Sequence, residues 1–163
     1  MTAFNFHITF VMALFGLNDI VTRFPEDHYG TLDGGCAYVE KAEGQRLVPS
    51  CIVGQFFSDL GLLRLLINPG AAGVVFTAQV GGETCSMRNE GALGPELRER
   101  LEGYGVTMDD NAHRLLWYTQ IEQDAGEPWP VALEMALTRM QRENLITVPE
   151  APVRDRALAH FSA

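Results

Sequence analysis

The stretch CAYVEKAEGQRLVPSCIVGQFF, Cys36 to Phe57, carries the signals of a strand, a turn, a second strand and a helix start in close succession. Apolar and polar side chains alternate over residues 36–41, as they do in a strand with one buried face, and a turn-forming segment follows at 42–44. Residues 45–48 then return beside the first strand. We therefore predict a β-hairpin that leads directly into a helix.

The helix after this hairpin begins at a cysteine. Pro49 ends the returning strand and Ser50 is placed to act as the N-cap, which predicts Cys51 as the first helical residue. At about 100° per residue, Cys51 and Gln55 fall on the side opposite the apolar face. Gly61 is placed to end the helix. The residues that we expect on the buried face are Ile52, Val53, Phe56, Phe57 and Leu60.

Helical signals dominate the rest of the chain. Apolar residues recur every three or four positions between residues 8 and 23, which predicts an amphipathic helix that Pro25 ends. Three further helices are predicted. The first begins at Pro95, the second follows an N-cap at Thr107, and the third begins at Pro128. The last two form an antiparallel pair joined by QDAGEPW, in which a glycine closes the first helix.

A second hairpin is predicted where residues 74–80 and 83–88 flank two glycines, a spacing suited to a primed turn. The fold class that follows is α+β. We predict a single compact domain over residues 1–147, mostly helical around one or two short antiparallel β-hairpins. Two prolines and the lack of a sustained period identify residues 148–163 as a C-terminal tail on the surface.

Composition narrows the classes of function. The chain has 163 residues, is 47% hydrophobic and has a formal net charge of −9, with no cluster of Lys and Arg to hold a nucleic-acid backbone. The apolar run at residues 8–17 is too short to cross a bilayer, and without a Lys or Arg before it we do not expect a secretory signal. Three cysteines do not form a disulfide framework, so we expect a reducing, cytoplasmic compartment.

Cys51 has two interpretations. A thiol in the first turn of a helix lies among unpaired N–H groups, which favour the thiolate and can hold an oxyanion, so Cys51 is a candidate catalytic nucleophile. Alternatively, the hairpin covers this side and the thiol is simply enclosed, as cysteines outside disulfides usually are. We favour the enclosed thiol, because no histidine has a spacing that identifies it as the base.

Two further roles for the cysteines lack a local signature. Cys36, Cys51, Cys85 and His28 could supply four zinc ligands, but the spacings contain no CxxC or HxxxH pair, and we expect no metal. A disulfide between Cys36 and Cys51 is geometrically feasible if the strand and the helix start abut, but it is unexpected in a reducing compartment.

Aromatic and carboxamide side chains gather at the predicted corner of the helix pair. Such a set could stack a nucleobase or anchor a partner protein. The interpretation that we favour is structural, with Gln123 and Asp124 bonded to loop amides and Trp129 packed beneath them. The residues of this corner are Trp117, Tyr118, Gln120, Gln123, Asp124 and Trp129.

Three motifs resemble a group of small uncharacterised proteins encoded by actinobacteriophages and their hosts. The group has the patterns Cys-x-Tyr-Val, Pro-x-Cys-(Ile/Leu)-Val-Gly and Gln-Asp-x-Gly-x-Pro-Trp. The resemblance covers residues 27–137, without a counterpart for residues 68–106, and implies a phage or actinobacterial source but no activity. The positions that carry it are Cys36, Tyr38 and Val39; Pro49, Cys51, Ile52, Val53 and Gly54; and Gln123, Asp124, Gly126, Pro128 and Trp129.

We therefore expect a phage-encoded accessory protein that works by binding a host protein or a small ligand, including interference with host defence. The alternative is a cysteine-dependent hydrolase with Cys51 as nucleophile, since PSCIVGQF is also similar to the helix start of NlpC/P60-type peptidases. No His-bearing strand follows here. No cofactor is expected, and the sequence does not indicate an oligomeric state. The predicted binding surface comprises Tyr38, Cys51, Gln55, Gln123, Asp124 and Trp129.

Overall fold

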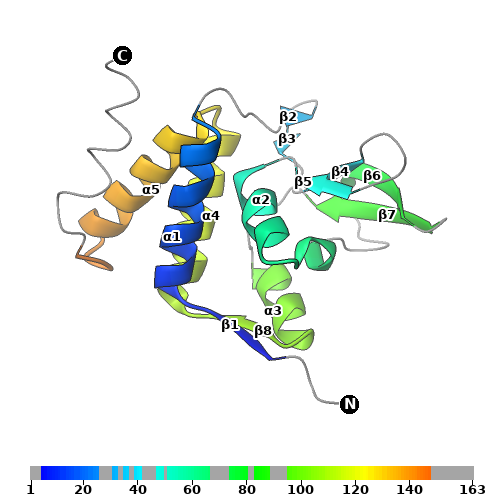
Figure 1. The fold of residues 1–163 in the computed structure, drawn as a ribbon, viewed down its shortest axis with the longest axis horizontal. Helices are drawn as coiled ribbons and strands as arrows, with labels where there is room; N and C mark the ends of the chain where they lie inside the picture. The colour runs from blue at the N-terminus through cyan, green and yellow to red at the C-terminus, as the bar shows by residue number, and fades with distance from the viewer. Residues whose placement is uncertain are drawn as a thin grey trace.

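The computed structural model describes residues 5–25, 31–32, 35–36, 39–41, 47–49, 51–66, 74–80, 83–88 and 95–147. Side-chain surroundings are described for residues 5–25, 49, 51–66 and 98–147. The described part is mostly helical, as predicted (Figure 1). Its helices are α1 (Phe10–Arg23), α2 (Ile52–Asp59), the 3-10 helix η2 (Leu63–Leu66), α3 (Pro95–Gly103), α4 (Asp110–Asp124) and α5 (Trp129–Arg142).

The strands are short and pair two by two. A parallel pair joins β1 to β8, and antiparallel pairs join β2 to β3, β4 to β5 and β6 to β7. Their bounds are β1 (Phe6–Ile8), β2 (Thr31–Leu32), β3 (Gly35–Cys36), β4 (Val39–Lys41), β5 (Leu47–Pro49), β6 (Val74–Val80), β7 (Glu83–Arg88) and β8 (Val106–Met108).

The parallel β1–β8 pair sets the start of two helices, and the sequence did not predict it. Ile8 pairs with Met108, and each strand runs directly into a helix. Thr9 caps α1, whereas Asp109 caps α4, where its Oδ1 accepts from the amide of Ala112 at 2.7 Å. The predicted cap at Thr107 is therefore wrong, because residues 106–108 are extended in β8.

Asp109 also ties the two helix starts together. Its second carboxylate oxygen, Oδ2, accepts a hydrogen bond from the amide of Phe10, the first residue of α1, at 2.8 Å. Its own amide donates to the carbonyl oxygen of Ile8 at 3.1 Å. One side chain therefore satisfies orphan amides of two helices, which places the first turns of α1 and α4 side by side.

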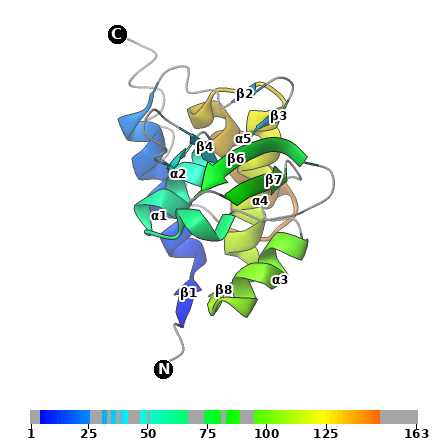
Figure 2. The ribbon, with the colours of Figure 1, turned by 90° about the vertical axis from the view of Figure 1, so that its right-hand side faces the viewer.

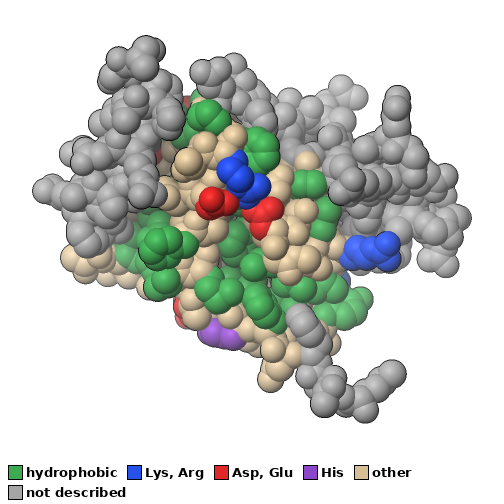
Figure 3. All heavy atoms as spheres, in the orientation of Figure 1, with side chains coloured by type: hydrophobic (Ala, Val, Ile, Leu, Met, Phe, Trp, Pro, Cys, Tyr) green, Lys and Arg blue, Asp and Glu red, His purple; other side chains and the backbone are tan. Residues whose placement is uncertain are grey.

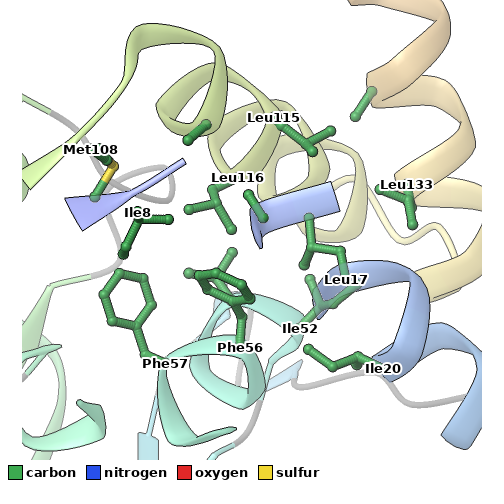
Figure 4. Close-up of a cluster of buried hydrophobic side chains, with 14 of the residues drawn as sticks. Ile8, Leu17, Ile20, Ile52, Phe56, Phe57, Met108, Leu115, Leu116 and Leu133 are labelled. Atoms are coloured by element: carbon green, nitrogen blue, oxygen red, sulfur yellow. The ribbon is translucent and has the colours of Figure 1, made fainter. Parts of the chain in front are cut away.

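The core lies between the helices and this parallel pair (Figure 4). Among the residues whose side chains are described, the core does not support the predicted arrangement of helices around antiparallel hairpins. Figures 1 and 2 place β4 to β7 beside α2, on the side away from α5. The predicted turns at 42–44 and 81–82 lie outside the described residues. The core residues that Figure 4 labels are Ile8, Leu17, Ile20, Ile52, Phe56, Phe57, Met108, Leu115, Leu116 and Leu133.

The ends of three helices share one backbone arrangement. Gly61, Gly126 and Asn144 follow α2, α4 and α5 with positive φ angles of 72°, 103° and 55°. After α2, the amide of Leu62 donates back to the carbonyl of Phe57 at 2.8 Å, and the other two helices close with equivalent bonds. The predicted stops at Gly61 and Gly126 are confirmed.

Helices α1 and α2 approach closely at Gly16. A Cβ atom built on Gly16 would lie 2.6 Å from Cε2 of the buried Phe56 ring. The glycine therefore allows the aromatic ring to lie directly against the backbone of α1.

None of the described helices combines the length and apolar character needed to cross a membrane. The predicted tail at 148–163 lies outside the described residues.

Candidate functional site

Cys51 is the N-cap of α2 rather than its first helical residue. Its backbone is extended, with φ of −140° and ψ of 168°, because the chain arrives from β5. The Sγ atom accepts a hydrogen bond from the amide of Gly54 at 3.2 Å, and its carbonyl accepts from the amide of Gln55 at 2.8 Å. The thiol thus accepts the N-cap hydrogen bond that a serine or aspartate side chain usually accepts at a helix start.

The thiol is enclosed. Cys51 has no exposed surface, and Ile52, Val53 and Gly54 around it are buried as well. The sequence placed Cys51 off the apolar face of its own helix, but other helices cover that side too. The structure agrees with the enclosed thiol and gives a nucleophile no access from solvent.

Gln123 of α4 closes the start of α2. Its Oε1 accepts a hydrogen bond from the amide of Ile52 at 2.9 Å, across 71 positions of sequence. The structure therefore brings the two halves of the predicted site together, but as part of the interior. With Gln123 and the Cys51 thiol occupying the amides of Ile52 and Gly54, neither of those two donors is available to an oxyanion.

The rest of the predicted corner is also structural. Trp129 is 5% exposed and packs edge to face against Phe24, with ring centroids 5.8 Å apart. Asp124 lies at the surface and accepts from Nε2 of the buried Gln120 at 2.6 Å. Gln123 bonds to the first turn of α2, at the amide of Ile52.

The side chain of Gln55 bonds within its own helix rather than to Gln123. Gln55 is half-buried and donates from Nε2 to Oδ1 of Asp59 at 2.7 Å. Tyr38 lies outside the described residues, as do His28 and the side chains of Cys36 and Cys85, so the zinc alternative stays untested. The predicted disulfide alternative is not formed, because Cys51 takes part in no disulfide. Within the described ranges, no group of three His, Cys, Asp or Glu side chains could hold a metal ion.

A second polar cluster fastens the end of α5 to α4. Tyr118 donates from its hydroxyl to Oε2 of Glu143 at 2.7 Å, and the guanidinium of Arg139 lies 3.9 Å from the centre of the Tyr118 ring. Burial and the bond to Glu143 raise the pKa of Tyr118, while the bond from Tyr118 lowers the pKa of Glu143. These contacts hold the end of α5 against α4.

The feature that the sequence interpretation missed is the outer face of α1, defined by Val11 and Phe15. Phe15 is 69% exposed and Val11 is 57% exposed, and the two lie one turn apart on the same side of the helix. Figure 3 shows hydrophobic side chains gathered over the lower part of α1, with charged side chains above them. Eight successive residues without a polar side chain, Phe10 to Leu17, already indicated that some had to face outward.

Comparisons with protein-family models, with curated proteins and with solved structures found no match. The site must therefore be interpreted from its own geometry.

Proposed function

We propose that this chain is a non-enzymatic accessory protein that binds another protein through the outer face of α1. The observation that carries the proposal is the exposure of Phe15 together with Val11, one turn apart on a helix that is apolar on every side of its first two turns. Large apolar side chains that gather on a surface mark sites of protein association. The resemblance to actinobacteriophage proteins supports a host protein as the partner.

The interior geometry supports binding rather than catalysis. A cysteine nucleophile needs solvent access and free donors for the oxyanion, whereas Cys51 is enclosed and two amides at its helix start are occupied. A nucleobase pocket at Trp129 is likewise disfavoured, because that ring is packed against Phe24. The predicted binding surface at this corner is replaced in the proposal by the outer face of α1.

The size of the effect follows from the exposed area. Full burial of a phenylalanine side chain contributes about 1.5–3 kcal/mol, and about two thirds of that remains available at Phe15. Loss of this side chain should therefore weaken binding by about 1–2 kcal/mol, which corresponds to about 5–30-fold in Kd. Val11 adds a smaller contribution of the same kind.

The test is affinity capture from an actinobacterial host lysate with the full chain, Phe15→Ser and Tyr104→Ser. Tyr104 is a matched control because it is 57% exposed but lies at the end of the β1–β8 pair away from α1. A protein retained by the wild type and by Tyr104→Ser but lost with Phe15→Ser is expected, and titration calorimetry with that purified protein then measures the loss in Kd. Equal retention by all three chains, or no retained protein, would contradict the proposal.

A further inference from the structure

The outer edge of β1 is an open sheet edge. In a parallel pair, alternate residues of a strand bond to its neighbour, and on β1 these are Phe6 and Ile8. The amide of Phe6 donates to the carbonyl of Gly105 at 2.9 Å, and the carbonyl of Ile8 accepts from the residue after β8 at 3.1 Å. The N–H and C=O groups of His7, between them, therefore point away from β8. Among the described strands only β8 pairs with β1, and His7 is exposed.

The opposite edge of the pair, along β8, is covered. Nη2 of Arg98 donates to the carbonyl of Met108 at 3.1 Å, which fixes α3 beside that strand. Proteins usually cover or block sheet edges in this way, because an open edge can pair with another chain. On β1 the imidazole of His7 bonds through Nδ1 to Oγ1 of Thr107 at 2.8 Å, so the ring leans over β8 and leaves its own edge unobstructed.

The open edge and the outer face of α1 lie on the same side of the molecule. Strand β1 runs directly into α1, and β8 into α4. In Figure 2, β1 and α1 lie to the left of β8 and α4. The edge points away from β8, and Val11 and Phe15 point away from the buried Ala13 and Leu17 of their own helix. About 6 Å of strand and 9 Å of helix separate His7 from Phe15, which about five extended residues can span.

A sheet edge selects its occupant by backbone conformation. An extended segment presents free N–H and C=O groups that can pair with those of His7, whereas a helix has already paired most of its own. Alternate side chains of an added strand lie on one face, where they can follow the edge onto Val11 and Phe15. We infer that the partner is recognised through an extended segment that pairs with the outer edge of β1 and continues over Val11 and Phe15, with apolar side chains at alternate positions.

This inference rests on the proposed function for the existence of a protein partner and adds the conformation in which that partner binds. Two exposed side chains alone offer far less than the roughly 800 Å² per partner that a stable interface buries. Backbone hydrogen bonds to an edge strand supply affinity that does not depend on a large apolar area. The edge therefore makes a small apolar face sufficient for a peptide-like partner.

The test selects random displayed peptides on the immobilised full chain and measures the Kd of the selected peptides by titration calorimetry. His7→Pro removes the outward N–H and blocks the edge, but takes no donor from the β1–β8 ladder. His7→Ala is the matched control, because it loses the same imidazole and keeps the N–H. We expect peptides with alternating apolar residues to bind the wild type and His7→Ala alike, and His7→Pro at least about tenfold more weakly, since a peptide carbonyl then loses its donor.

A second measurement needs no substitution. Hydrogen exchange at the His7 amide, followed by NMR in the wild type, should slow when a selected peptide binds, because the peptide carbonyl then accepts from that amide. Urea unfolding shows whether His7→Pro is folded. If it is not, the exchange at His7 decides alone.

Several outcomes would overturn the inference. They are the failure to select any peptide, equal Kd values for His7→Pro and His7→Ala, and an exchange rate at His7 that the peptide leaves unchanged. A dimer in sedimentation that His7→Pro abolishes would show that β1 pairs with a second copy instead. If peptides bind the edge but no host protein depends on Phe15, only the proposed function fails. If a host protein depends on Phe15 but is retained equally by His7→Pro and His7→Ala, only this inference fails.

Discussion

Replacing Gln123 with methionine tests the contact that closes the start of α2. Methionine keeps the length and most of the volume of glutamine but removes the oxygen that accepts from the amide of Ile52 at 2.9 Å. Both residues are buried, so this amide then has no acceptor and no water. An unsatisfied buried donor costs about 1–3 kcal/mol, and we expect Gln123→Met to destabilise the protein by that amount.

Gln120→Met is the matched control. Gln120 lies on the same helix, is 1% exposed and is also a carboxamide. Within the described residues its Oε1 accepts no hydrogen bond, and its Nε2 donates to Asp124, which is at the surface and can be hydrated instead. The same substitution should therefore cost less than about 1 kcal/mol at this position.

Urea unfolding followed by circular dichroism measures both variants. With a slope of about 2 kcal/mol per molar urea, Gln123→Met should lower the midpoint by about 0.5–1.5 M at an unchanged slope. The midpoint of Gln120→Met should move by less than half as much. Equal shifts in the two variants, or a larger shift for Gln120→Met, would refute the reasoning that Gln123 acts as the cap of α2.

Three further predictions concern other contacts. Gly16→Ala should lower the urea midpoint, because overpacking against Phe56 costs about 1–3 kcal/mol and outweighs a gain of about 1 kcal/mol in helix propensity; a stabilised variant would contradict this. The raised pKa of Tyr118 means that its contribution is lost as pH rises above about 10, and the lowered pKa of Glu143 means that its contribution is lost as pH falls below the ordinary glutamate range; Tyr118→Phe should reduce both changes in urea midpoints measured across pH. Cys51, mapped by mass spectrometry, should react with iodoacetamide at least about tenfold more slowly in the folded protein than in urea, since modification requires opening; equal rates would show an accessible thiol.

Local signals explain what the sequence could predict. A helix stop needs only a residue that tolerates positive φ, which is why Gly61 and Gly126 were placed correctly. The buried face of α2 was predicted through Ile52 to Phe57 because those side chains lie on one stripe of the helix. Pro95 was likewise placed correctly as the start of α3.

Features that depend on distant segments were not predictable in the same way. Three-residue strands are too short to show a period, so the β1–β8 pair is invisible until residues 100 positions apart are placed together. The burial of Cys51 depends on α4, and no periodicity within α2 reports that cover. On α1, the fully buried residues are Ala13, Leu17 and Ile20, whereas larger apolar residues such as Phe10 and Leu14 are only partly buried.

The β1–β8 pair also affects the order in which the chain can fold during its synthesis. Strand β1 has to wait for a partner that follows 100 residues later, which takes the ribosome about 5–20 s to add. During that interval Leu17 and Ile20 of α1 have no α4 to cover them. The N-terminal half therefore cannot complete its core while it is being made, and the nascent chain presents an apolar helix to cellular chaperones until α4 emerges.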